Sequence, residues 1–266
     1  MITSKTNAKV RYVRSLYRRA NRHRERQFVV EGVRLIEEMI KAGHEPAFFF
    51  YTEEGFGNPR ASALVEGLTS TSTEVMSVSE GVMRFMADTK TPQGVLAVAP
   101  FPELEPVESR LTLVLDAVRD PGNLGTILRT AEAADVGQVI TIRGTVDPFS
   151  PKVVRGGMGA HFRLPIQRDL NWEQAGRAVE ERGVLLADAR QGTPYYEVNW
   201  RRPIALIVGG EAHGAGRTAQ GLATERVTIP MAEGVESLNV AVAAGIMLFE
   251  AARQREADRV VNGEGG

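Results

Sequence analysis

Between residues 111 and 230 the chain repeats one pattern, in which a short apolar segment of strand length is followed by a stretch with helical spacing. The strand-like segments lie near residues 111–118, 138–142, 164–168, 184–189, 204–208 and 226–230. Parallel strands need long crossover connections, usually helices, and strands covered on both faces are apolar along their whole length. The pattern therefore predicts an α/β fold with a largely parallel sheet and helices on both faces.

The first hundred residues alternate in the same way but with shorter elements. Strands are expected at 28–30, 48–51, 75–78 and 95–99, with helices between them, which predicts a small α/β domain. Residues 100–106 are rich in proline and acid, a composition typical of a linker. We expect domains at 1–100 and 111–259, a linker at 101–110 and a disordered tail at 260–266.

The composition excludes several classes of protein. The chain has no cysteine, so it has no disulfide framework, thiolate nucleophile or cysteine zinc site. Its four histidines are scattered without metal-ligand spacing, and no metal is expected. No apolar stretch is long enough to span a membrane, and the N-terminus lacks a signal-peptide pattern. These features predict a cytoplasmic protein.

Positive charge is concentrated at the N-terminus. Residues 1–26 contain nine Lys and Arg residues against Glu25, although the whole chain carries only −1. Val10, Val13, Leu16 and Tyr17 recur among them at helical spacing, which predicts an amphipathic helix with a basic face. A solvated helix face would look the same, but the local excess of positive charge favours contact with a polyphosphate. The candidate residues for this contact are Arg18, Arg19, Arg22 and Arg24.

The region near the C-terminus combines a turn with a strongly apolar helix. Residues 229–239 read Ile-Pro-Met-Ala-Glu-Gly-Val-Glu-Ser-Leu-Asn, and an apolar run follows to Phe249. Ser237 and Asn239 are good helix-capping residues. The helix predicted over 238–252 is apolar on nearly every side, so we expect it to be buried all round, in a core or a subunit contact. It is either an ordinary capped core helix or one wall of a ligand site.

Two further segments place glycines and polar residues directly after apolar strands. One contains Asn123-x-Gly125-x-x-x-Arg129 and the other Gly209-x-Glu211-x-x-Gly214. Ligands of open α/β sheets bind at such strand ends. These two motifs and the Ile-Pro-Met to Ser-Leu-Asn-Val segment, in this order, resemble the three signature motifs of the SpoU (TrmH-like) RNA 2′-O-ribose methyltransferases of the SPOUT superfamily.

The resemblance implies a C-terminal trefoil knot, a homodimer, S-adenosylmethionine as cofactor and RNA as substrate. It also implies catalytic roles for Arg129, Asn123, Glu211 and Asn239. The cofactor-binding residues that it implies are Gly209, Ile229, Met231, Ser237 and Leu238, which as core residues would look no different.

Arg129 is the residue on which the chemistry of methyl transfer to a hydroxyl depends most. On a helix starting near Asn123 it projects away from the apolar side. A guanidinium stays protonated in proteins, so binding a phosphate and favouring the alkoxide is an easier role than that of a general base, although arginine-assisted deprotonation is the family's usual description. A surface pair with Glu132, three residues on, is the alternative.

Two shorter segments point to RNA contact. In residues 150–160, Lys152 and Arg155 lie three apart on one predicted helical face, and Gly157 stands where serine is common in the family. They suit phosphate contact, with a solvated helix start as the alternative. Residues 28–34, Phe-Val-Val-Glu-Gly-Val-Arg, resemble the start of the ribosomal-protein-L30-like RNA-binding domain that precedes many SpoU domains.

Other functions remain to be weighed against this one. A nucleotide-binding oxidoreductase would suit the glycine-rich turns, but Gly-x-Gly-x-x-Gly after the first strand and a P-loop are absent. A non-catalytic RNA-binding protein would leave Arg129, Glu211 and Asn239 unexplained together. The N-terminal domain favours ribosomal RNA, most of all 23S ribosomal RNA, over transfer RNA, and an antibiotic-resistance role stays open.

Overall fold

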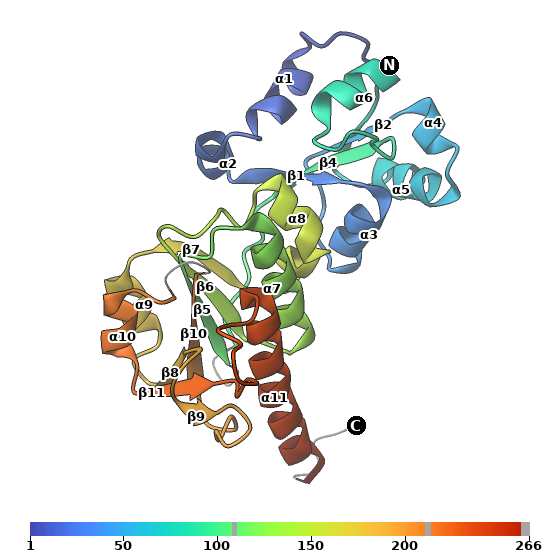
Figure 1. Cartoon of the computed structure of the whole chain (residues 1–266). Coiled ribbons are helices and arrows are strands. Elements are labelled where there is room, and N and C mark those ends of the chain that lie inside the picture. The colour runs from blue at the N-terminus through green and yellow to red at the C-terminus, as the bar shows by residue number, and fades with distance from the viewer. Residues whose placement is uncertain (108–110, 211–213, 262–266) are drawn as a thin grey trace. The chain divides into compact units, whose positions relative to one another are not determined.

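The computed structural model describes the chain except residues 108–110, 211–213 and 262–266. The chain divides into two compact units, each described by itself (Figure 1). Unit 1 comprises Met1–Glu103 and Phe149–Phe162, and unit 2 comprises Leu104–Pro148 and Arg163–Gly266. The predicted boundary near residue 100 is thus close to the observed one.

Unit 1 is built on a four-stranded sheet of order β1-β4-β2-β3, in which β4 is antiparallel to both of its neighbours. The strands are β1 Gln27–Glu31, β2 Phe48–Tyr51, β3 Glu74–Ser77 and β4 Val95–Pro100. The helices are α1 Ala8–Ser15, α2 Arg19–Glu25, α3 Val33–Lys41, α4 Glu53–Phe56, α5 Pro59–Thr69, α6 Glu80–Met86, α8 Pro151–Gly157 and the short η1 Ala160–Phe162. Apolar residues of α1 and α6 form the core on one face of the sheet, and those of α3 and α5 form the core on the other.

The segment 149–162, which lies within the predicted domain 111–259, packs in unit 1 of the structure. Phe149 and Phe162 pack against Phe28 of β1, and Phe101 stacks on Phe149 with 4.0 Å between the ring centroids. All four rings are buried in the core of unit 1. Adjacency in the sequence does not reveal which core an aromatic side chain joins.

The basic N-terminal segment forms two helices where one was predicted. Asn7 caps α1 by accepting a hydrogen bond from Lys9 N, and the helix ends at Ser15. The chain becomes extended at Arg18 before α2 begins. Val10, Val13 and Leu16 are fully buried, so the predicted apolar stripe does face the core.

Unit 2 contains a seven-stranded sheet of order β7-β6-β5-β10-β8-β11-β9, with every pairing parallel. The strands are β5 Thr112–Asp116, β6 Gln138–Ile142, β7 Ile166–Leu170, β8 Gly183–Ala187, β9 Thr193–Pro194, β10 Ile204–Gly209 and β11 Glu225–Thr228. The helices are α7 Pro121–Ala133, α9 Trp172–Ala178, α10 Arg217–Leu222 and α11 Val240–Val261. Six strands were predicted, and the seventh, β9, is too short to leave a pattern.

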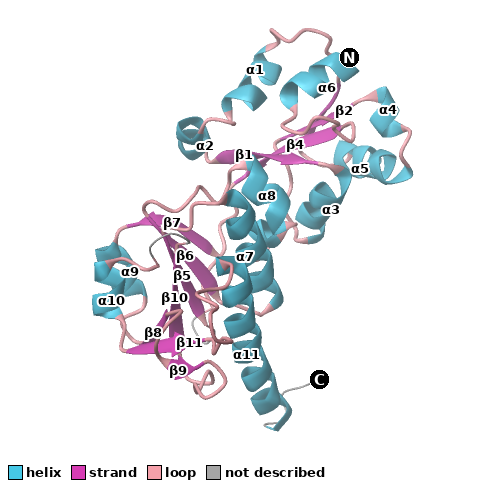
Figure 2. Cartoon of the chain, viewed as in Figure 1, coloured by secondary structure: helices cyan, strands magenta, loops and turns pink. Residues whose placement is uncertain are grey.

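Helices cover both faces of this sheet, as predicted. Ala175, Val179 and Ala219 of the α9–α10 layer pack with Val114 and Ile207 of the strands. On the opposite face α7 and α11 pack against each other (Figure 2). This arrangement brings the start of α11 next to the start of α7.

The long apolar helix α11 is only partly buried within this chain. Ala244, Met247 and Leu248 are buried, but Val242 and Phe249 are 52% and 51% exposed. Within the single chain these two side chains are not covered, and their burial in a subunit contact stays a prediction, because a continuous apolar run does not show which of its sides meet a neighbour. None of the helices that the structure describes is long and apolar enough to cross a membrane.

Candidate active site

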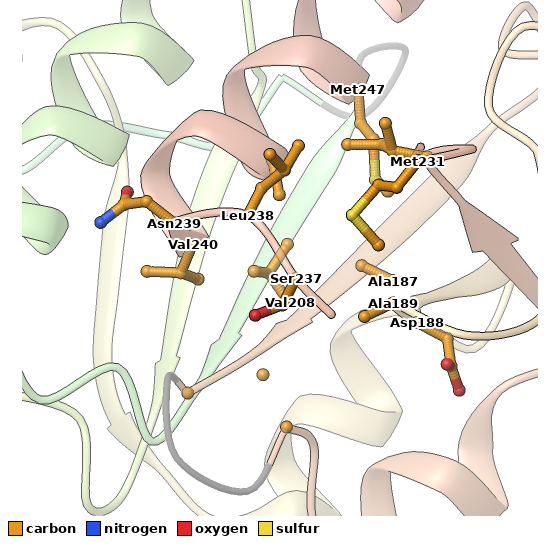
Figure 3. A pocket seen from close by; sticks show the side chains of 15 residues that line it. Ala187, Asp188, Ala189, Val208, Met231, Ser237, Leu238, Asn239, Val240 and Met247 are labelled. Atoms are coloured by element: carbon orange, nitrogen blue, oxygen red, sulfur yellow. The ribbon is translucent and has the colours of Figure 1, made fainter. Parts of the chain in front are cut away.

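A cavity of about 420 Å³ opens in unit 2 at the carboxyl ends of β8 and β10 (Figure 3). One side is formed by residues 187–189 after β8 and by Val208, Gly209 and Gly210 at the end of β10. The other side is formed by Ile229 and Met231 after β11, by residues 237–240, and by Ala243 and Met247 of α11. The structure thus gathers all five predicted cofactor-binding residues around one cavity: Gly209, Ile229, Met231, Ser237 and Leu238.

The floor of the cavity depends on glycines that have no room for a side chain. A Cβ on Gly209 would lie 2.2 Å from Ala215 N, and one on Gly210 would lie 2.1 Å from Ala117 O. Asp116, at the end of β5, accepts a hydrogen bond of 2.7 Å from Gly216 N. The ends of β5 and β10 and the chain after residue 214 therefore pack backbone against backbone. That packing explains why the motif is glycine-rich.

Apolar side chains form much of the remaining wall. Figure 3 shows Leu238, Met231 and Val208 around the cavity, and Leu238 is 38% exposed although it is a large apolar residue. An apolar slot with backbone N–H and C=O groups at one edge suits a flat heterocycle, because the ring is buried while its polar edge is recognised.

Asp188 is a cavity residue that the sequence patterns did not single out. Its carboxylate accepts hydrogen bonds from Arg190 N and Gln191 N and pairs with Arg226. Burial by itself would raise the pKa of Asp188, but these hydrogen bonds outweigh it and lower the pKa. In Figure 3 the carboxylate points away from Leu238 and Met231. The signal that could have found it is its position directly after a buried strand.

Asn239 joins the third motif to the first. Its Oδ1 accepts hydrogen bonds from Ala241 N and Val242 N, and so caps α11. Its Nδ2 donates to Asn123 Oδ1 of α7 at 3.0 Å. Ser237 precedes the helix and lines the cavity instead of capping it. One side chain therefore starts α11 and ties it to α7.

Asn123 does not cap the helix that begins close to it. The helix begins at Pro121, and its N-cap is Asp120, whose carboxylate accepts from Asn123 N at 2.8 Å. Asn123 therefore lies inside the first turn. Its side chain accepts from Asn239 rather than capping its own helix.

Arg129 lies on the exposed side of α7, as its helical position predicted, while Ile127 and Leu128 are fully buried. The alternative pair with Glu132 does not form, because Glu132 pairs with Arg163 at 3.1 Å. Within the described part of the chain, Arg129 makes no ion pair and does not line the cavity. Its guanidinium is exposed to solvent. Glu211, the remaining predicted catalytic residue, lies outside the described residues.

The predicted RNA-binding residues all lie in unit 1, and one of them, Arg22, is too buried to contact RNA. Arg22 is 3% exposed and donates to Leu16 O at 2.7 Å, so it stabilises the connection between α1 and α2 rather than facing solvent. Arg18 and Arg19 are exposed, and Arg24 is exposed but pairs with Glu25.

Lys152 and Arg155 belong to α8 of unit 1, not to the unit that carries the cavity. Arg155 pairs with Asp88 at 2.7 Å, and Lys152 is exposed. Among the described residues, no group of three His, Cys, Asp or Glu side chains is placed to hold a metal ion.

Comparisons with known proteins match two family models to the chain, and the range of the first includes the segment 149–162 that packs in unit 1. The model of the SpoU rRNA methylase family matches residues 110–249, and that of the MRM3-like substrate-binding domain matches residues 7–97. The chain is 36% identical to an uncharacterised tRNA/rRNA methyltransferase of Synechocystis over 96% of this chain and 94% of that protein. It is 32% identical to RlmP of Bacillus subtilis, a 23S rRNA (guanosine(2553)-2′-O)-methyltransferase, over 93% of this chain and 97% of that one.

A solved structure extends the likeness to the fold. The AdoMet-bound rRNA methyltransferase of Sinorhizobium meliloti superposes with a TM-score of 0.83 at 32% identity, over 95% of this chain and 97% of that one. This superposition spans both units. The SpoU family model covers the strands of unit 2, the cavity and the Asn123–Asn239 contact. The chain belongs to the SpoU rRNA methylase family.

Proposed function

We propose that this protein is an RNA (ribose-2′-O)-methyltransferase that uses S-adenosylmethionine to methylate a 2′-hydroxyl of 23S ribosomal RNA. The observation that carries the proposal is the cavity at the ends of β8 and β10. Residues of the second and third motifs line it, and the 3.0 Å bond from Asn239 to Asn123 brings the first motif to its edge. Three motifs distant in the sequence thereby meet at one site.

The residues around the cavity fit the proposed methyl donor. A volume of about 420 Å³ lies in the range of small-molecule sites. Leu238, Ile229 and Met231 supply apolar surface for an adenine ring, and the backbone around Gly209 supplies N–H and C=O groups for its edge. The sulfonium of the donor supplies an electrophilic methyl group, so the protein needs no covalent nucleophile.

Arg129 is proposed to act on the RNA. It is exposed, its charge is not neutralised by a carboxylate in the described part of the chain, and it shares α7 with Asn123. A fixed guanidinium can hold the phosphate next to the target ribose and stabilise the oxyanion that forms as the hydroxyl loses its proton. Asn123 and Asn239 keep α7 in position against α11, and Glu211 remains a proposed member of the same site.

Ribosomal RNA is the proposed substrate class because the likeness to RlmP and to the Sinorhizobium enzyme spans both units. Unit 1 matches a substrate-binding domain, so it is proposed to bind the RNA. Its candidate phosphate contacts are Arg18, Arg19, Arg24, Lys152 and Arg155. The likeness to rRNA methyltransferases of bacteria supports a cytoplasmic location as part of this proposal.

The enzyme is proposed to be a homodimer with the trefoil knot of its family. Val242 and Phe249 lie seven residues apart on α11, on the same side, and both are half exposed. A second copy would cover this apolar stripe, which as a bare surface would favour association. The family membership of unit 2 supports the knot.

The test is direct. The purified protein is incubated with methyl-labelled S-adenosylmethionine and with 23S ribosomal RNA, 16S ribosomal RNA or transfer RNA, each from cells that lack the gene. We expect label in 23S RNA and one new ribose methylation on mapping. Label in transfer RNA alone would refute the substrate assignment, and the absence of label in every RNA would refute the activity.

A further inference from the structure

We propose that Phe85, flanked by Lys5 and Arg14, is a stacking site for an unpaired base of the RNA substrate, with the two cations contacting the adjoining phosphates. The inference rests on the proposed function, and it names the surface of unit 1 and the form of RNA that this surface binds. Phe85 belongs to α6, which packs beside α1 (Figure 1).

The geometry around the ring is that of an aromatic platform between two cations. Lys5 Nζ lies 5.5 Å from the centroid of the Phe85 ring, and the guanidinium carbon of Arg14 lies at the same distance. Arg14 also lies 4.8 Å from the ring of Tyr17. Contacts of this kind at exposed sites are weak and exchange readily with solvent. The base of a nucleotide can therefore stack on the ring while its phosphates contact the two cations.

Phe85 is not among the buried core residues of unit 1. Its neighbours on α6, Val82, Met83 and Met86, are buried in the cluster between the helix and the sheet. Phe85 remains 36% exposed on another side of the helix. A single exposed apolar residue is common on protein surfaces, so the inference depends on the two cations that lie beside this ring.

The charge around this ring favours a polyanion. Lys5, Arg11, Arg14 and Arg18 are exposed and form no ion pair within the part of the chain that the structure describes. Lys9 and Arg24, by contrast, are paired with Glu74 and Glu25. Unneutralised bases beside an exposed aromatic are the combination that binds single-stranded nucleic acid, since every base has a face that can stack. Paired bases in a duplex cannot offer that face, so the surface fits an unpaired segment.

The test measures the binding of the full-length protein to a labelled oligoadenylate and to a duplex RNA of the same length, by fluorescence anisotropy over a range of salt. Phe85→Ala should weaken oligoadenylate binding roughly five- to hundred-fold without changing the slope of log affinity against log salt. Phe85→Trp should retain binding. The matched control is Phe56→Ala, which removes another exposed phenylalanine of unit 1 and should change affinity less than two-fold.

A second variant separates stacking from charge. Replacing Lys5 and Arg14 by glutamine should make the salt slope shallower by about 0.7 for each lost contact. Unchanged oligoadenylate affinity in Phe85→Ala would overturn the inference. Equal losses for duplex and single strand, or competition by polyglutamate as strong as that by RNA, would also overturn it. None of these results would refute the proposed methyltransferase activity, which is tested separately by methyl transfer with the unchanged protein.

Discussion

Asn239 performs two tasks, and substitutions can separate them. Its Oδ1 accepts from Ala241 N at 2.9 Å and from Val242 N at 3.3 Å, while its Nδ2 donates to Asn123 at 3.0 Å. Asn239→Ser keeps a capping oxygen but is too short to reach α7. Asn239→Ala loses both the cap and the bridge. The pair of variants therefore isolates the contribution of the contact between the two helices.

The expected magnitudes follow from these contacts. A hydrogen bond of this kind contributes about 0.5–1.5 kcal/mol to the free energy of unfolding, so Asn239→Ser should lose that amount. Asn239→Ala should lose about 1 kcal/mol more, the usual contribution of an N-cap. If the bridge aligns α7 for catalysis, the same energy corresponds to a roughly two- to twelve-fold slower methyl transfer in the serine variant.

The assay is single-turnover methyl transfer to the RNA substrate, measured together with urea unfolding. Asn171→Ala is the matched control, because Asn171 caps α9 of the same unit with a hydrogen bond of 2.8 Å from Gln174 N. It should lose similar stability and keep its rate. Asn123→Ala should be non-additive with Asn239→Ser, since each removes the same bond. Wild-type turnover in Asn239→Ser, or full additivity in the double variant, would refute the reasoning.

Three further predictions follow from the same structure. Arg129→Ala should slow single-turnover methyl transfer by a factor of roughly 10²–10³, because the side chain is proposed to act on the RNA. Its affinity for S-adenosylhomocysteine, measured by calorimetry, should not change. The control is Arg177→Ala, which removes another exposed arginine on a helix of unit 2 and should leave the rate unchanged. Gly209→Ala should destabilise the protein by about 1–3 kcal/mol in urea unfolding and weaken S-adenosylhomocysteine binding, because the new Cβ would lie 2.2 Å from a backbone atom. The control is Gly221→Ala, whose Cβ would have no atom within 4 Å and which should be neutral or stabilising. Phe249→Glu should shift the protein to monomers in analytical ultracentrifugation, and an unchanged sedimentation coefficient would place the dimer contact elsewhere.

The sequence by itself determined the elements of unit 2 and the residues that gather at its cavity. Apolar strands repeated at regular spacing permit little other than a parallel sheet with helical crossovers, and the carboxyl ends of parallel strands lie at one edge. Gly209 ends such a strand and lies at the cavity. Met231 and Leu238 were expected there because their motif resembles that of the SpoU family, not because of the strand pattern. The sheet itself depends on local pattern and on the chirality of βαβ units, which a sequence displays directly.

The tertiary structure alone decided which partner each side chain takes. In the sequence Arg22 is indistinguishable from the other basic residues of its segment, yet it is buried and donates a hydrogen bond to Leu16 O. Phe149 follows the second strand of unit 2, yet it stacks with Phe101 in unit 1, so removal of residues 1–100 would uncover it rather than leave a clean second domain. Asn123 lies in the first turn of α7 and bonds to Asn239, 116 residues away. Such choices depend on contacts between distant segments, and the periodicity of a segment carries no information about them.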